Sequence, residues 1–375
     1  MKKTVFALAT LSAAGLAMGQ EVVRIGHVAA MTGPVAHFGK DSENGVRMAI
    51  EALNARGATI AGRTVKWVLA PEDDAGEPKQ ATAAAQKLAD AKVNGVIGHE
   101  TSGTTIPASK IYYDAGIPQI TASSTNPAYT KQGFNTTFRV VANDIQLGQA
   151  LGRYAVKTMG AKRVAVIDDR TAYGQGLVSE FVNGLRQQKV NVVAKEFTND
   201  KATDFSAILT RIRASNPDLV FFGGMNAVAG PMLRQMKQLG LNVKMMGGDG
   251  ICSDEMHKLS GGTMADGQVV CAEAGGVEAS GKAGMDNFRA AYRKRFGIDV
   301  QIIAPYSYDA TLLLAEAMNK AGSAAPAKYL PELAKIRYKG VTGNIAFDPR
   351  GDIRDGTITL YTFKGGHRTQ IAVTK

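Results

Sequence analysis

VNGVIGHETSGTTIPASKIYYDAGIPQITASST, residues 93–125, contains the pattern that decides the fold. Two short segments rich in apolar residues, 93–97 and 117–122, flank a longer stretch, 102–115. Short apolar runs bounded by turn residues are typical of buried strands, and the longer stretch between them is typical of a connecting helix. The segment therefore predicts one strand–helix–strand unit of a parallel sheet.

The same alternation extends in both directions along the chain. Before residue 93 it predicts strands and helices in turn, at 22–30, 38–56, 63–70 and 77–92. After residue 142 the alternation restarts, with helices at 145–159, 173–188, 205–214 and 228–239 and strands at 163–167, 190–197, 219–222 and 243–246. Two such series predict an α/β protein with two parallel sheets, each covered by helices.

The end of the chain has a different pattern. It predicts helices at 286–296 and 308–321, strands at 344–348 and 357–363, and a turn at 349–352. These elements are too few for a third domain. We expect them to return to the first two domains and complete them.

The first residues have the pattern of a sorting signal. Met1, Lys2 and Lys3 are followed by an apolar stretch, 4–16, and by small residues in 17–19. This pattern predicts a signal peptide over 1–19, cleaved near Gln20, and hence export to the periplasm. A buried first helix or a membrane anchor is the alternative, but the apolar stretch is short for a stable membrane span.

Composition argues against several classes of protein. The formal charge is +11, yet no basic cluster interleaves with aromatic residues, so we expect no nucleic-acid partner. The five histidines form no metal-binding spacing, and the GxGxxG, GxSxG and P-loop patterns are missing, so we expect no metal, no cofactor and no enzyme. Cys252 and Cys271 are the only cysteines, and in an exported protein they predict one disulfide.

Two loops of the first series hold candidate binding residues, because open α/β sheets bind ligands at the carboxyl ends of their strands. Thr101 and Ser102 open a helix, where hydroxyls and free N–H groups favour an anion such as a carboxylate. Ser123 and Thr125 follow the next strand and offer hydroxyls and carbonyl groups. An ordinary helix cap and an ordinary turn explain these residues as well.

Two loops of the second series add further candidates. Tyr173 stands at a helix start, where it is placed to cover a ligand. Asp249 lies among glycines after a strand, where its carboxylate is placed to pair with an ammonium group. A common loop tyrosine and a solvated turn acid are the alternatives.

Read together, these segments resemble the leucine/isoleucine/valine-binding proteins of bacterial ABC transporters, which are type I periplasmic binding proteins. The resemblance covers nearly the whole chain after residue 19. It is carried, in order, by AMTGPVA at 30–36, DD at 73–74, PKQA at 78–81, VIGH at 96–99, PAS at 107–109, YGQGL at 173–177, DFS at 204–206, FD at 347–348 and GD at 351–352.

The resemblance implies two lobes joined by three crossovers, near 142, 272 and 345. The first lobe would consist of 20–142 and 273–345, and the second of 143–272 and 346–375. It also implies that Ser102 and Thr125 hold a ligand carboxylate, that the carbonyl of Ser123 and the side chain of Asp249 hold an ammonium, and that Tyr173 closes over the ligand.

Four positions depart from the family pattern, which often has Glu, Tyr, Tyr and an apolar residue where this chain has Asp249, Met225, Phe38 and Glu100. The amino-acid end of the ligand therefore looks retained, while the side-chain end differs. Tyr306 and Tyr308 are placed to line that end, although core packing explains Tyr308 equally well.

The resemblance implies a monomeric periplasmic receptor without catalytic activity. It would capture a small α-amino acid, branched-chain or otherwise neutral, and deliver it to an ABC permease in the inner membrane. Three alternatives stay open: a clamp for another carboxylate such as an aromatic or keto acid, a ligand-sensing regulator or receptor domain, and a periplasmic α/β enzyme.

Overall fold

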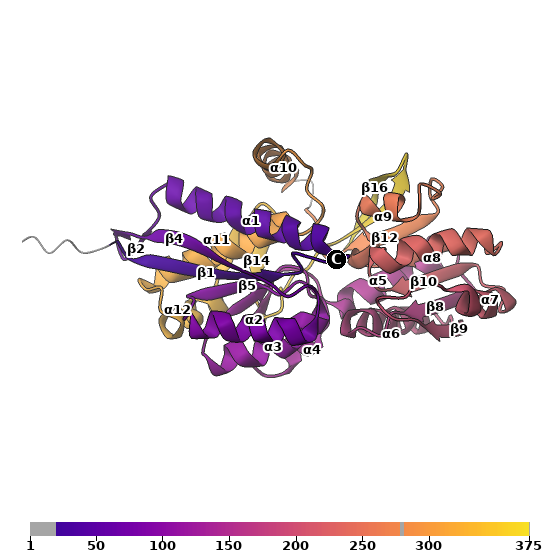
Figure 1. Cartoon of the computed structure of the whole chain (residues 1–375), viewed down its shortest axis with the longest axis horizontal. Coiled ribbons are helices and arrows are strands. Elements are labelled where there is room, and N and C mark those ends of the chain that lie inside the picture. The colour runs from indigo at the N-terminus through magenta and orange to yellow at the C-terminus, as the bar shows by residue number, and fades with distance from the viewer. Residues whose placement is uncertain (1–19, 278–280, 375) are drawn as a thin grey trace, which may run out of the picture.

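The protein has two lobes side by side, seen at the left and right of Figure 1. The computed structural model describes residues 20–277 and 281–374. The segment 1–19, where the sequence predicts a signal peptide, lies outside the described residues.

The first lobe is built on a five-stranded parallel sheet. Its strands follow the order β4 (Lys66–Asp73), β1 (Val22–Ala29), β5 (Gly95–Gly98), β6 (Gln119–Thr121) and β7 (Thr137–Arg139). Successive side chains of a strand point to opposite faces. Ile97 accordingly packs with the core under α1 and α11, while Val96 packs with the core under α2 and α3.

Helices cover both faces of this sheet (Figure 1). One face carries α1 (Ala36–Ala55) and α11 (Ala304–Ala321), and the other carries α2 (Pro78–Asp90) and α3 (Ser102–Asp114). The lobe also contains α4 (Ala128–Lys131), α10 (Lys282–Phe296), α12 (Pro326–Lys335) and two hairpins, β2 (Thr59–Ile60) with β3 (Arg63–Thr64) and β13 (Arg337–Gly340) with β14 (Gly343–Ala346).

The second lobe is built on a seven-stranded mixed sheet. Its strands follow the order β16 (His367–Thr374), β15 (Ile358–Lys364), β12 (Val269–Glu273), β11 (Lys244–Gly247), β10 (Leu219–Gly223), β8 (Val164–Asp168) and β9 (Val192–Phe197). β15 and β16 are the antiparallel members, added by the end of the chain. This return confirms that the last elements complete the two earlier series.

The helices of the second lobe are α5 (Asp144–Lys157), α6 (Ala172–Gln187), α7 (Ser206–Ala214), α8 (Asn226–Gln238), the short η1 (Asp249–Ile251) and α9 (Glu255–Leu259). Asn143 and Gln146 form a capping box that starts α5: the side chain of each accepts a hydrogen bond from the backbone N–H of the other. Glycines let α5 and α6 approach closely, since a Cβ on Gly152 would lie 2.8 Å from the Cα of Gly184.

Three passages join the lobes. The first two, after Arg139 and after Glu273, run side by side, and the Ala142 N–H donates to the Ala274 carbonyl at 3.0 Å. The third comes later than the expected residue 345. Arg139 of β7 forms an ion pair with Asp352 at 2.7 Å, and the two residues form a parallel bridge. Residues up to 352 therefore still lie against the first sheet, and the chain crosses between there and the start of β15.

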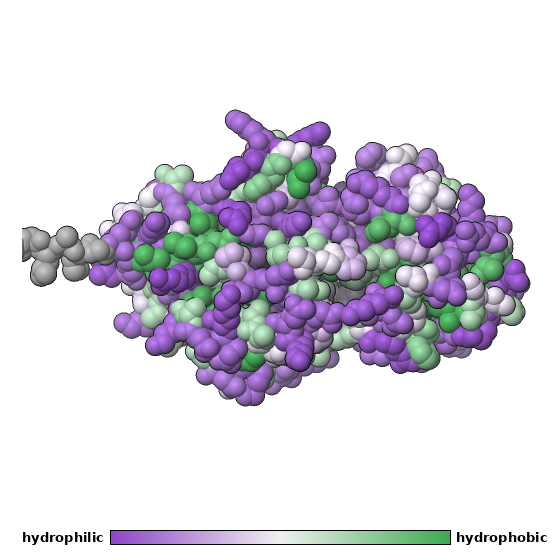
Figure 2. All heavy atoms as spheres, viewed as in Figure 1, coloured by the Kyte–Doolittle hydropathy of each residue, from purple (hydrophilic) through white to green (hydrophobic). Residues whose placement is uncertain are grey.

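The surface seen in Figure 2 is mostly hydrophilic, with apolar residues in small separate groups. Among the described residues, no helix is long and apolar enough to cross a membrane.

Candidate functional site

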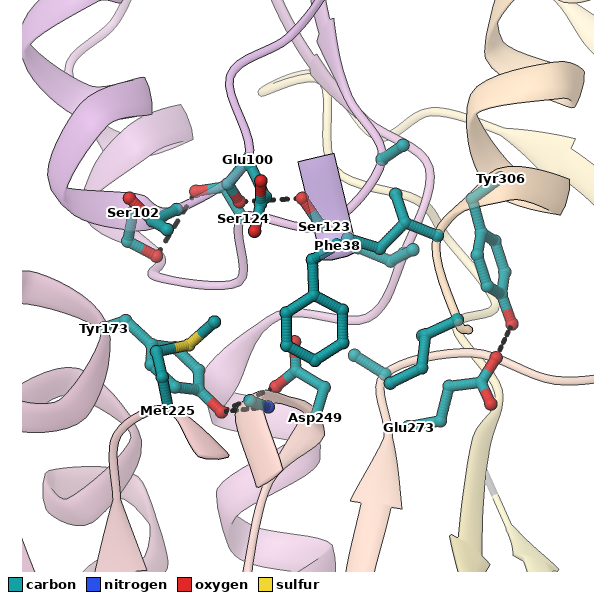
Figure 3. A pocket seen from close by; sticks show the side chains of 17 residues that line it. Phe38, Glu100, Ser102, Ser123, Ser124, Tyr173, Met225, Asp249, Glu273 and Tyr306 are labelled. Carbon is teal, nitrogen blue, oxygen red and sulfur yellow. Dashed lines mark hydrogen bonds between the residues drawn. The ribbon is translucent and has the colours of Figure 1, made fainter. Parts of the chain in front are cut away.

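A cavity that is partly open to solvent lies where the two lobes meet. The first lobe contributes loop residues to its lining and the second contributes Tyr173, Met225 and Asp249. Figure 3 shows these two groups facing each other, with the Phe38 ring between them. The cavity is therefore a candidate ligand-binding cleft between lobes.

The first-lobe side is a shelf of hydroxyl groups on two neighbouring loops. Ser102 begins α3, and its hydroxyl accepts a hydrogen bond from the Asn126 N–H at 3.2 Å. The Ser124 hydroxyl donates to Ser102 at 3.3 Å, and the Ser123 hydroxyl donates to the Glu100 carbonyl at 2.7 Å. The first N–H groups of a helix lack partners within it and favour an anion. This shelf is suited to a carboxylate.

A buried polar chain fixes the loop that leads into α3. The Nδ1 atom of His99 lies 2.7 Å from Asp74, and its Nε2 atom lies 3.1 Å from the Tyr112 hydroxyl. All three side chains are fully buried. The loop that carries Glu100, Thr101 and Ser102 is thus anchored from beneath.

The second-lobe side centres on Asp249. The Tyr173 hydroxyl donates to its carboxylate at 2.8 Å and accepts from the Gly250 N–H at 3.0 Å. Burial raises the pKa of Asp249 to about 6, although the Tyr173 hydrogen bond works in the opposite direction. A Cβ on Gly250 would lie 2.6 Å from the Gly224 carbonyl oxygen, so this close approach requires glycine. The pair forms an acceptor for a cationic group.

The predicted disulfide between Cys252 and Cys271 is confirmed. Cys252 follows the η1 turn that carries Asp249, and Cys271 lies in β12. The bond therefore fixes the turn that carries Asp249 to the sheet of the second lobe.

The remaining wall of the cleft is largely apolar. It is formed by Phe38, Met225, Ile302, Ile303 and Tyr306 together with small residues of the first two passages. The Tyr306 hydroxyl donates to Glu273 at 2.7 Å.

The buried Asp41 carboxylate places Ile302 and Ile303 in this wall. It accepts from the backbone N–H groups of both, at 2.9 and 2.7 Å, and from that of Ala304 at 3.0 Å. These contacts hold the start of α11, and the residues just before it, against the cleft.

Glu100 is a buried acid at the edge of the cleft. Its Oε2 atom accepts from the Ala30 N–H at 3.3 Å. Burial, and then the nearby charge of Asp74, raise the pKa of its carboxyl well above the usual range. The described lining thus holds three carboxyl groups, those of Glu100, Asp249 and Glu273, and no Lys, Arg or His side chain.

The structure brings nearly all the expected site residues to this one cleft. Those that line it are Phe38, Glu100, Thr101, Ser102, Ser123, Tyr173, Met225, Asp249 and Tyr306. Thr125 is not among the lining residues. It is fully buried beside the Asp144 carboxyl, whose pKa is raised to about 8 by burial despite the Thr125 hydroxyl. Tyr308 packs against Phe288 instead, with ring centroids 5.1 Å apart.

Sequence reasoning missed the residues that reach the cleft from the passages and from α11. They are Val141, Glu273, Ala274, Ile302 and Ile303. None of them follows a strand in a polar loop, so no local signal marked them. Among the described residues no cluster of His, Cys, Asp or Glu is arranged to hold a metal ion.

The lobes contact each other around the cleft. The Asn126 amide of the first lobe donates to the Ala172 carbonyl of the second at 2.6 Å. His37 lies 3.0 Å from the Asn226 amide, and Lys201 forms an ion pair with Glu77 at 2.5 Å. The structure therefore represents a closed arrangement of the two lobes.

Comparisons with known proteins agree with this architecture. A periplasmic binding protein family model matches residues 22–367. An amino acid binding protein of Pseudomonas aeruginosa is 38% identical over 96% of this chain and 95% of its own length. A leucine-, isoleucine-, valine-, threonine- and alanine-binding protein of the same organism is 32% identical over 97% and 96%.

Solved structures show the same likeness. The crystal structure of a leucine binding protein from Thermotoga maritima has a TM-score of 0.85 and 28% identity, covering 94% of this chain and 98% of the other. A branched-chain amino acid substrate-binding protein from Streptococcus pneumoniae, in complex with isoleucine, has a TM-score of 0.84 and 26% identity, covering 94% and 99%. The resemblance inferred from the sequence is confirmed: the chain belongs to the periplasmic binding protein family, whose members bind solutes and are not enzymes.

Proposed function

We propose that the cleft captures a small neutral α-amino acid and that the protein delivers it to an ABC permease of the inner membrane. The observation that carries this proposal is that a site suited to a carboxylate and a site suited to an ammonium face each other across one cleft. The shelf at the start of α3 suits a carboxylate, and Asp249 with Tyr173 suits an ammonium. In this arrangement an α-amino acid contacts both lobes and stabilises the closed form.

The charge of the cleft separates this proposal from its nearest rival. A ligand with a carboxylate alone, such as an aromatic or keto acid, would enter a described lining that has three carboxyl groups and no cationic side chain. It would leave Asp249 buried without a counter-charge, which is costly. The names of the relatives point the same way, since they include leucine-, isoleucine- and valine-binding proteins.

The transport part of the proposal rests on relatives and on the chain's first residues. A solved ABC transporter substrate-binding protein from Desulfitobacterium hafniense, in complex with Leu, has a TM-score of 0.77 and 27% identity. The predicted signal peptide over 1–19 supports export to the periplasm.

Calorimetry tests the proposal directly. Ligand released from purified, denatured protein is first identified by mass spectrometry, and the standard amino acids are screened by thermal shift. The tightest-binding amino acid is then compared with its analogue that lacks the α-amino group. We expect the analogue to bind roughly 30-fold to several thousand-fold more weakly. Equal affinity would show that the cleft does not read an ammonium, and would favour a carboxylate-only ligand.

A further inference from the structure

Glu100 has a polar atom that the protein itself does not satisfy. Its side chain lines the cleft, and the residue is 6% exposed. Oε2 accepts from Ala30, whereas Oε1 has no hydrogen-bond partner among the described residues. Buried polar atoms without a partner are rare because each one carries a desolvation cost.

The other two carboxyl groups of the cleft differ from Glu100 in this respect. Asp249 accepts from the Tyr173 hydroxyl and faces the seat proposed for the ligand's ammonium. Glu273 accepts from Tyr306 at 2.7 Å and from Tyr361 at 3.1 Å. Of the three carboxyl groups, only Glu100 has a buried oxygen without a hydrogen-bond partner in the described chain.

The position of Glu100 relates it to the rest of the ligand. Figure 3 shows Glu100 on the first-lobe side beside Ser123, across the Phe38 ring from Asp249. With the ligand's carboxylate at Ser102 and its ammonium at Asp249, as proposed above, Glu100 is available to the ligand's side chain.

The charges nearby indicate which chemistry fits. Burial and the neighbouring carboxyl groups of Asp74 and Asp41 raise the pKa of Glu100, which favours its neutral form. A neutral carboxyl both donates and accepts a hydrogen bond. Hydroxyl and carboxamide groups also do both, whereas a hydrocarbon would close Glu100 off from water without a partner.

We infer that Glu100 is a specificity-determining residue that selects amino acids with a hydroxyl or carboxamide in the side chain over hydrocarbon side chains of the same shape. This inference rests on the proposed function, because it presupposes that the cleft holds an α-amino acid. It states which kind of ligand side chain is preferred, which the proposed contacts to the ligand's carboxylate and ammonium do not decide.

Two pairs of amino acids of nearly equal shape provide the test. Threonine and valine differ by a hydroxyl in place of a methyl, and asparagine and leucine differ by a carboxamide in place of an isopropyl group. Calorimetry on the wild-type protein should show tighter binding of the polar member of at least one pair, by roughly 5- to 150-fold. Tighter or equal binding of the hydrocarbon member in both pairs overturns the inference.

Two variants locate the effect at residue 100. Glu100→Leu removes the polar group at similar size, and should abolish or reverse the preference. Glu100→Gln keeps a donor and an acceptor, and should retain it. A preference that survives in Glu100→Leu refutes the role of this residue. If Glu100→Leu does not fold, the affinities of the wild type and of Glu100→Gln for the two pairs still test the inference. Loss of the polar preference in Glu100→Gln also counts against it.

The outcomes separate this inference from the proposed function. Binding of the four amino acids without any polar preference refutes the inference and leaves the proposed function intact. Failure of every α-amino acid to bind refutes the proposed function, and the inference with it. Thermal unfolding of each ligand-free variant confirms that it is folded before binding is measured.

Discussion

Replacing Asp249 with alanine tests the ammonium seat most directly. The carboxylate is partly buried in the cleft, and its described partners are the Tyr173 hydroxyl, at 2.8 Å, and backbone groups of its own turn. An ammonium about 4 Å from a carboxylate gains roughly 4 kcal/mol at an effective dielectric constant of about 20. Truncating one member of such a buried pair costs about 2–5 kcal/mol in measured cases.

We therefore expect Asp249→Ala to weaken amino-acid binding by roughly 30-fold to several thousand-fold. A solvated turn acid would cost under about 0.5 kcal/mol. Isothermal calorimetry measures the affinity of wild type and variant for the amino acid and for its analogue lacking the α-amino group. The four values form a thermodynamic cycle that gives the interaction free energy between Asp249 and the ammonium. The variant should discriminate far less between the two ligands than the wild type does.

Asp218→Ala is a matched control in the same lobe. This carboxylate accepts from the Lys162 and Arg163 amides and does not line the cleft, so its loss should leave binding unchanged. If Asp249→Ala discriminates between amino acid and analogue as strongly as the wild type, Asp249 does not hold the ammonium, and the assignment of the second-lobe seat is refuted.

Four further predictions concern pH, the disulfide, closure and a buried acid. The pKa of Asp249 is about 6 in the ligand-free protein, and a bound ammonium would favour the ionised carboxylate, so affinity for the amino acid should fall as pH drops below 6, by up to about tenfold per pH unit. Asp249→Asn should remove this part of the pH dependence. Calorimetry at several pH values checks the prediction, and a constant affinity contradicts it. Replacing Cys252 and Cys271 with serine should lower the free energy of unfolding by about 3 kcal/mol in the chain-entropy account, as measured by denaturant titration, while an unchanged midpoint would contradict that figure. Small-angle scattering should give a smaller radius of gyration with ligand than without it, and an unchanged radius in a sample known to be open beforehand argues against a clamp. Burial raises the pKa of Asp144 in the folded protein to about 8, well above its ordinary value of 3.8, so the stability of the wild type should decline as pH rises between these two values. Asp144→Asn should therefore stabilise the protein more at pH 8 than at pH 5, as measured by thermal unfolding, and an equal effect at both would refute this.

The sequence by itself determined the α/β class and the order of most elements. Continuous apolar runs such as 219–222 are unfavourable to expose to water, and they alternate with longer amphipathic runs, so the local pattern was sufficient. Local chemistry also marked the loops after strands, because Ser102, Tyr173 and Asp249 stand where parallel strands end. The disulfide followed from there being two cysteines.

Short or late elements were not determined in this way. β7 has only three residues, too few for a periodic signal, and it is held by pairing with β6. β12 has five residues, and on one side it pairs with β15, about 90 residues later in the chain. The third crossover was placed too early because only the contact between Arg139 and Asp352, 213 residues apart, shows that the chain has not yet left the first lobe.

The composition of the cleft was decided largely by tertiary structure. The start of α11 reaches the ligand wall because the Asp41 carboxylate holds Ile302 and Ile303 from more than 260 positions away. Thr125 and Ser123 are two residues apart, yet one is enclosed beside Asp144 and the other lines the cavity. A sequence pattern reports what one segment needs to bury, whereas the packing of two lobes decides which atoms remain free to meet a ligand.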